Sequence, residues 1–400
     1  MDKQGVRTSY RACVLGLVLV FSGAAVPVAA APMPSPSPSA SKVQLPVVPA
    51  RLGTASDQCT KASATVMKSV PWAQRWLGLS GISRFTDGAG TVVGVVDTGV
   101  SAKAPGLSGR VAGPATDDCV GHGTFLAGTV AAAPQKGSGY TGVAPGARIR
   151  AVRGTDSTGV PSASSVAKGI REAVDGDAQV IVVAAALEKG SGALTAAVAY
   201  ARKQDVVVIA PAVPDASATA SDSSASPPTS FWPAADDGVV SVLDIDIDGQ
   251  RPDGERVPDR ADLAAPGQGV TGIGPVGKGH YLGNGPSVAA AIVAGAAALV
   301  RAYRPELSAE EVVQRLRSTS YPADVPEIDV YGALTGVAST DRPTSGTDTD
   351  HAFTPLAVVH EGPAMVRSLV LMGGCVLFGL AVWSGTVLVR RSRSNAKPGL

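Results

Sequence analysis

Short, strongly apolar runs alternate along this 400-residue chain with segments whose apolar residues recur at helical spacing. The runs are too apolar for a sheet with one face in water, and they therefore predict buried strands. These strands are expected at Thr91–Val96, Ala147–Val152, Gln179–Ala184, Val206–Ala210 and Val239–Ile245. The helices are expected at Ser162–Val174, Ala193–Lys203, Ser287–Tyr303 and Ser308–Ser318. Such alternation favours an α/β domain whose parallel sheet carries helices on both faces.

The charges of the chain argue against a nucleic-acid binder. Its 34 basic and 33 acidic residues leave a formal net charge of +1, so no overall field would attract an anionic polymer. Charged residues make up 17% of the chain, below the roughly 25% of a typical soluble domain, which also excludes charge-rich disorder. Nucleic acid is therefore not an expected partner.

The first 30 residues are typical of a secretory signal. Lys3, Arg7 and Arg11 precede an apolar stretch over 13–26, and small residues follow it, so we expect cleavage after about Ala30. A retained N-terminal anchor is the alternative, but the apolar run is short for a membrane span. Residues 31–54 begin with alternating proline and serine and predict an extended spacer.

The other end of the chain predicts a membrane anchor. Residues 368–389 carry no charge, and 22 residues at about 1.5 Å each reach about 33 Å, enough to cross a ~30 Å hydrocarbon core. The alternative, a buried core helix, does not explain the basic residues Arg390, Arg391 and Arg393 that follow at once. By the positive-inside rule, the tail over 390–400 lies in the cytoplasm.

Between the two ends we expect one exported domain on a stalk. Residues 338–367 are rich in threonine, serine, aspartate and proline, a composition that cannot bury a core. The folded domain is therefore expected over 55–337, outside the cytoplasmic membrane.

The four cysteines agree with export. Cys13 lies in the predicted signal and Cys375 in the predicted anchor, which leaves Cys59 and Cys119 in the exported part. An oxidising compartment favours one disulfide between them, with two unpaired thiols as the alternative. Two cysteines and scattered histidines do not give the spacing of a zinc site, and no metal or cofactor is expected.

Three residues could form a catalytic group. Asp97 ends the first predicted strand, at the edge where open α/β sheets place their sites. His122 lies between two glycines just before an apolar helical run at 125–133, and Ser287 opens a helix after a glycine-rich turn. Taken singly, the histidine could be structural and the serine a simple N-cap. Taken together, they have the chemistry of an acid, a base and a hydroxyl nucleophile.

The chain has four histidines that could act as the catalytic base. His351 and His360 lie in the predicted stalk, and His280 lies in a glycine-rich turn, which leaves His122.

At these residues the chain resembles the subtilisin-like serine proteases. The motifs are Val95–Gly99 (VVDTG), Gly121–Thr124 (GHGT), Gly142–Gly146 (GVAPG), Asp262–Gly267 (DLAAPG) and Gly285–Ala290 (GPSVAA). They occur in the family's order over about Trp72–Leu334. The resemblance implies that Ser287 attacks peptide bonds, that His122 is the base and that Asp97 orients it.

Within this family the chain is most similar to the mycosins, membrane-anchored proteases that accompany type VII secretion. The features shared with them are the export signal, the C-terminal anchor, the segment Val70–Gln74 (VPWAQ) and the Cys59/Cys119 pair. This similarity implies protein or peptide substrates and a partner in the secretion membrane complex.

One departure from the family concerns the oxyanion hole. The family supplies an asparagine after a strand, in an Ala-Ala-Gly-Asn run, whereas residues Ile209–Pro214 contain no amide. Loss of such a donor costs about 10² to 10³ in turnover. Val182–Ala184 also replace an Asn-x-Ser landmark, and Pro286 and Ala291 replace a threonine and a proline. A pseudoprotease that acts as a structural component of the complex is therefore the alternative function.

A second pattern has the spacing of a calcium-binding loop. Its residues are Asp244, Asp246, Asp248, Gly249 and Glu255. Apolar residues alternate with these aspartates as in a strand, and no helix leads into them, so we expect a strand that ends in a turn.

Overall fold

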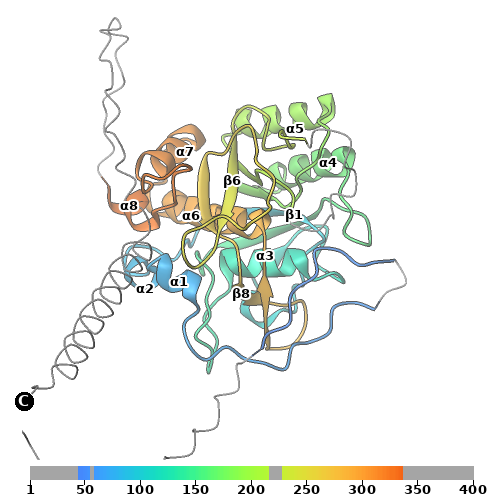
Figure 1. Cartoon of the computed structure of the whole chain (residues 1–400), viewed down its shortest axis with the longest axis vertical. Helices are drawn as coiled ribbons and strands as arrows, with labels where there is room; N and C mark the ends of the chain where they lie inside the picture. The colour runs from blue at the N-terminus through green and yellow to red at the C-terminus, as the bar shows by residue number, and fades with distance from the viewer. Residues whose placement is uncertain (1–43, 55–57, 216–227, 337–400) are drawn as a thin grey trace, which may run out of the picture. The chain divides into compact units, whose positions relative to one another are not determined.

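The computed structural model describes residues 44–54, 58–215 and 228–336, which contain a seven-stranded parallel sheet (Figure 1). The strands run in the order β2-β3-β1-β4-β5-β6-β7. Their bounds are β1 Val92–Asp97, β2 Val111–Ala112, β3 Arg148–Arg153, β4 Val180–Val183, β5 Val207–Pro211, β6 Val239–Ile245 and β7 Leu263–Pro266. A separate antiparallel hairpin consists of β8 Val270–Ile273 and β9 His280–Gly283.

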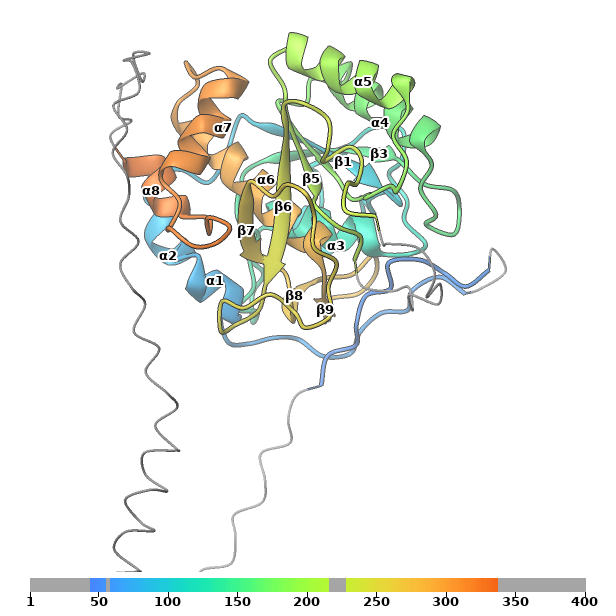
Figure 2. The same ribbon diagram turned by 45° about the horizontal axis from the view of Figure 1, so that its top comes forward.

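Helices cover both faces of this sheet (Figure 2). Their bounds are α1 Trp72–Trp76, α2 Leu79–Ile82, η1 Pro105–Leu107, α3 His122–Ala131, α4 Ala163–Val174, α5 Gly192–Lys203, α6 Pro286–Tyr303, α7 Ala309–Ser318 and α8 Val330–Thr335. Helices α3 and α6 pack on one face, over the largest hydrophobic cluster, and α4 and α5 pack on the other. The predicted α/β class with a doubly covered parallel sheet is confirmed.

Burial explains why the strands are so apolar. Every residue of β4, β5 and β6 is buried, because each of these strands has neighbours on both edges and helices above and below. The predicted helix starts are also present. Ser162 and Ser308 each form a capping box with the residue three positions on, Ser165 and Glu311 respectively.

Helix α6 is the centre of the domain. In the described part of the chain it is the one helix whose length and hydropathy would suffice for a membrane span, and 89% of that stretch is buried inside the fold. It is therefore a core helix. The predicted signal (1–30), stalk (338–367), anchor (368–389) and tail (390–400) lie outside the described residues.

Part of the predicted spacer packs against the domain. We call residues 44–54 and 58–69 the N-terminal extension. Leu45 and Val48 are buried, and Val48 N–H donates to the Leu282 carbonyl at 2.9 Å, which adds the extension to the edge of β9. Leu52 N–H donates to Thr158 O at 2.8 Å. Residues 44–54 of the predicted spacer are therefore packed on the folded domain.

The extension is also tied down covalently. Cys59 and Cys119 form the expected disulfide, with their Cα atoms 4.5 Å apart. Thr60 N–H donates to the Cys119 carbonyl at 2.9 Å, so backbone hydrogen bonding continues the link. The disulfide joins the extension to the loop that leads into α3.

The calcium-like pattern forms a strand and a turn, as predicted. Strand β6 ends at Ile245, and Asp246 Oδ1 accepts hydrogen bonds from Asp248 N–H and Gln250 N–H, both at 2.9 Å. In the described residues, no three His, Cys, Asp or Glu side chains gather as they would around a metal ion.

Breaking the disulfide should lower the stability of the domain. The bond closes a 60-residue loop, and the loop-entropy model gives about 4 kcal/mol for its loss. Denaturant unfolding of Cys59→Ser should show this decrease in the free energy of unfolding. The double variant Cys59→Ser/Cys119→Ser should lose no more than the single one, because the same bond is absent. Unchanged stability in both variants would contradict a structural role for the disulfide.

Candidate active site

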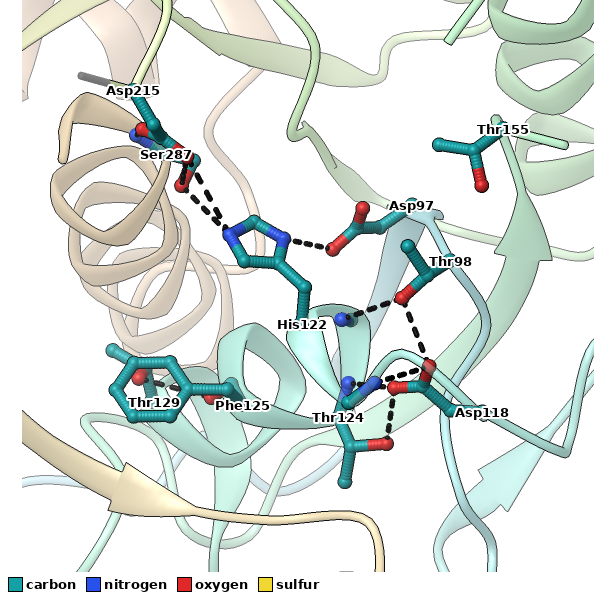
Figure 3. A network of polar contacts seen from close by, with 12 residues as sticks. Asp97, Thr98, Asp118, His122, Thr124, Phe125, Thr129, Thr155, Asp215 and Ser287 are labelled. Carbon is teal, nitrogen blue, oxygen red and sulfur yellow. Dashed lines mark hydrogen bonds and ion pairs between the residues drawn. The ribbon is translucent and has the colours of Figure 1, made fainter. Parts of the chain in front are cut away.

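Asp97 and His122 meet at the carboxyl edge of the sheet. Asp97 is the last residue of β1, which lies between β3 and β4, and its side chain is buried. His122 is the first residue of α3, so the helix begins three residues before the predicted apolar run. His122 Nδ1 lies 2.6 Å from Asp97 Oδ2 (Figure 3). A carboxylate can only accept a hydrogen bond, so this contact places the imidazole proton on Nδ1.

A half-buried carboxylate, that of Asp118, holds the start of α3 in place. Asp118 Oδ1 accepts from Thr98 Oγ1 at 3.0 Å and from Gly121 N–H at 2.8 Å. Asp118 Oδ2 accepts from the backbone N–H and the hydroxyl of Thr124, at 2.8 and 2.7 Å. The helix has no side-chain N-cap; Asp118 accepts the N–H groups of Gly121 and Thr124, and Thr98 Oγ1 accepts that of Gly123. Asp118 is therefore a positioning residue for His122 that the sequence motifs did not indicate.

Ser287 comes from the opposite side of the site. It is the second residue of α6, it is fully buried, and its Oγ lies 3.3 Å from His122 Nε2. The N-cap of α6 is Gly285, with φ +118°, so the simple N-cap role for Ser287 is wrong. Pro286 occupies the first helical position, where its missing N–H costs nothing. The structure thus brings the three predicted residues into one line.

Asp215 is a fourth member of this group, and the sequence motifs did not reveal it. Its Oδ1 accepts the Ser287 backbone N–H at 2.9 Å, and its Oδ2 accepts the Ser287 hydroxyl at 2.6 Å. Asp215 Oδ2 also lies 3.5 Å from His122 Nε2 (Figure 3). The residue follows β5 directly after the run over 209–214 in which no amide was found.

Glycine at position 285 makes this contact possible. A Cβ atom there would overlap the Asp215 carboxyl group, and the positive φ is itself unfavourable for other residues. The Asp215 side chain is 16% exposed, so it remains in contact with the adjoining cleft.

The Ser287 hydroxyl has one proton and two acceptors within reach. The Asp215 oxygen is closer than the imidazole nitrogen, at 2.6 against 3.3 Å, so in this arrangement the hydroxyl donates to Asp215. His122 would accept that proton only after the hydroxyl turns.

Acidic neighbours dominate the electrostatics. Burial lowers the pKa of His122, but the charges of Asp97 and Asp215 outweigh burial and hold that pKa well above its usual value. Burial and the nearby Asp244 together raise the pKa of Glu255 to about 8. Asp215 contributes to the raised pKa of both Asp244 and Glu255.

A cleft of about 580 Å³ opens beside these groups. The residues that line it include Asp97, His122, Asp215, Glu188, Glu255 and Arg256. Ala184–Ala186, just beyond β4, and Ala50 and Arg51 of the N-terminal extension also border it. A base and an orienting carboxylate at the wall of an open cleft, with the Ser287 hydroxyl buried 3.3 Å from the base, are suited to acyl transfer.

His280 has a structural place outside this group. Its Nδ1 accepts the Met67 N–H at 3.1 Å, its Nε2 lies 3.3 Å from Ser138 Oγ, and burial lowers its pKa. These contacts hold the N-terminal extension against β9.

Comparison with known proteins agrees with this geometry. Residues 88–353 match the model of the subtilase family. Over 362 residues the chain is 33% identical to Mycosin-4 of Mycobacterium tuberculosis, which covers 78% of this chain and 79% of that protein. Over 239 residues it is 36% identical to subtilisin DY of Bacillus licheniformis, which covers 58% of this chain and 84% of that protein.

Solved structures give the same assignment. The crystal structure of MycP1 from Mycobacterium smegmatis matches with a TM-score of 0.61 and 26% identity, over 72% of this chain and 91% of that one. A chain of an intact ESX-5 inner membrane complex matches with a TM-score of 0.62 and 25% identity, over 87% of this chain and 96% of that one. The fold, the site and these similarities show that the chain belongs to the subtilase family of serine endopeptidases.

Proposed function

We propose that this chain is an exported serine endopeptidase, anchored by residues 368–389, that cleaves peptide bonds through an acyl-enzyme. The observation that supports this most directly is the line of contacts from Asp97 through His122 to Ser287, in which Asp97 and His122 line the cleft. A purely structural role for His122 does not account for these contacts, in which Nδ1 contacts a carboxylate and Nε2 contacts a serine hydroxyl.

Each residue of this line has a defined role in the proposal. Asp97 accepts the Nδ1–H of His122 and so leaves Nε2 free to take a proton. His122 removes the hydroxyl proton as Ser287 Oγ attacks the substrate carbonyl, and then gives it to the departing amine. Water hydrolyses the acyl-enzyme with His122 as the base again. These steps use side chains, one backbone N–H and water.

Type VII secretion is the proposed setting. The similarity to Mycosin-4 and to a chain of the ESX-5 inner membrane complex supports protein or peptide substrates and a secretion-complex partner. In this proposal the peptidase domain lies on the extracytoplasmic side of the membrane and residues 390–400 lie in the cytoplasm.

A second candidate function is that of a catalytically weak or inactive component of the complex. It is favoured by one observation. The Ser287 N–H, which an oxyanion would need, is already bonded to a carboxylate.

A fluorophosphonate probe should label the full-length protein at Ser287 if His122 activates that hydroxyl. Labelling should disappear in Ser287→Ala and fall at least about 100-fold in His122→Ala, since a positioned general base contributes about 10² to 10⁴. Ser191→Ala, at the N-cap of α5, is the matched control and should label normally. In-gel fluorescence between pH 5 and 9 measures this. Absence of labelling in folded protein at every pH would favour the scaffold role.

Proteolysis of intact cells tests the proposed topology. Protease added outside should digest the domain over 55–337, once the cell wall is permeable, and should spare an epitope placed after Leu400, because the basic cluster holds the tail inside. Loss of the epitope together with a protected domain would reverse the orientation.

A further inference from the structure

Asp215 lies where a tetrahedral intermediate would need hydrogen-bond donors. An oxyanion formed at Ser287 is stabilised by donors about 2.7 to 3.1 Å from it, and the Ser287 N–H is the donor on this chain's backbone. Asp215 Oδ1 now accepts that N–H at 2.9 Å, so one carboxyl oxygen stands close to the oxyanion's own position. The other oxygen contacts both Ser287 Oγ and His122 Nε2, at 2.6 and 3.5 Å.

We propose that Asp215 is the oxyanion-hole side chain of this enzyme and that it acts only when its carboxyl group carries a proton, so that a proton gates peptide hydrolysis. This inference rests on the proposed endopeptidase function. It assigns to a carboxyl group the position that an amide occupies in the related enzymes.

The two charge states of Asp215 have opposite effects. As a carboxylate it can only accept hydrogen bonds, so it occupies the Ser287 N–H and repels a second negative charge beside it. As a carboxylic acid it has an O–H group that can donate to the oxyanion and release the N–H to do the same. Asp215 follows β5, and Gly285 has no Cβ atom that would overlap the Asp215 carboxyl group. The carboxyl group therefore stays within reach of the substrate carbonyl.

Acidic groups surround Asp215 from several elements. Asp97 on β1 lines the same cleft, and the charge of Asp215 contributes to the raised pKa of Asp244 on β6 and of Glu255 in the loop after β6. His122 on α3 lies 3.5 Å from the Asp215 carboxyl group. The basic groups near this wall include Arg51, which lines the cleft, Arg251, which lies 3.7 Å from Glu255, and Arg256, which pairs with Glu188 at 3.0 Å.

One proton shared between His122 and Asp215 is enough for catalysis. In the reactive form the proton is on Asp215, and His122 is neutral. His122 takes the hydroxyl proton as the Oγ–C bond forms, and the oxyanion accepts bonds from Ser287 N–H and Asp215 O–H. The C–N bond then breaks, His122 returns its proton to the amine, and Asp215 keeps its own. Loss of the shared proton at high pH leaves a neutral base but an ionised, obstructing Asp215.

The pH dependence of three variants tests this gate. Full-length protein in detergent micelles would be compared as wild type, Asp215→Asn and Asp215→Ala, by fluorophosphonate labelling rates and by hydrolysis of fluorescein-labelled casein between pH 5 and 9. The wild-type rate should fall about tenfold per pH unit on the alkaline side, whereas the Asp215→Asn rate should stay level. Asp215→Asn should exceed Asp215→Ala by about 10² to 10³, the effect of one donor.

A control variant and three possible outcomes separate a failure of the proton gate from a failure of the endopeptidase function. Asp324→Asn, at an exposed position outside the cleft, should follow the wild-type profile. A constant ratio of Asp215→Asn to wild type at all pH values would overturn the gate, although the enzyme would remain active. Equal rates for Asp215→Asn and Asp215→Ala would show that position 215 does not contact the oxyanion. No reaction in folded Asp215→Asn would overturn the endopeptidase function, and the gate with it.

Discussion

The burial of helix α6 against the sheet is the constraint on which the site depends. All residues from Pro286 to Arg301 are buried, so the helix cannot shift without opening the core. Its first turn carries Ser287, and the strand edge opposite carries Asp97. The same packing that excludes water from the core therefore fixes the distance between the nucleophile and the orienting carboxylate, with His122 between them.

The charge arrangement around His122 adds a second carboxyl group to the catalytic line. One imidazole stands between two carboxyl groups, with Asp97 at 2.6 Å from one nitrogen and Asp215 at 3.5 Å from the other. The first contact orients the base, and the second competes with it for the serine proton. Activity then depends on the protonation state of a carboxyl group as well as on that of the histidine. This dependence on protonation connects the two candidate functions. In the proposal, the protein is inactive when Asp215 is ionised and active when Asp215 is neutral.

Much of the fold could be predicted from the sequence because its strands are buried on both faces. Five apolar runs gave the strands from β1 to β6 except β2, and the helices α4 to α7 followed from periodicity and capping residues. The strands that were not predicted are short. Strands β2 and β7 and the hairpin β8–β9 have two to four residues each and do not lie in longer apolar runs, so tertiary contacts define them.

The site was predictable to the extent that local motifs mark it. Asp97, His122 and Ser287 each lie in a glycine-containing motif at the end of an element. Asp215 lies in no motif and contacts a residue 72 positions away, so only the packing of β5 beside α6 brings it to Ser287. The run over 209–214, which contains no amide, ends one residue before it. A carboxylate directly after the run in which the family's asparagine was expected was the signal that could have found it.

The contact between Asp215 and His122 can be measured directly by the titration of His122. Isotope-labelled full-length protein in detergent micelles would be followed by the NMR signals of the His122 ring as the pH is raised. Because the charge of Asp215 helps to hold the pKa of His122 well above its usual value, that pKa should be lower in Asp215→Asn and unchanged in Asp324→Asn. An identical His122 pKa in the wild type and in Asp215→Asn would show that the carboxylate does not lie against the catalytic group.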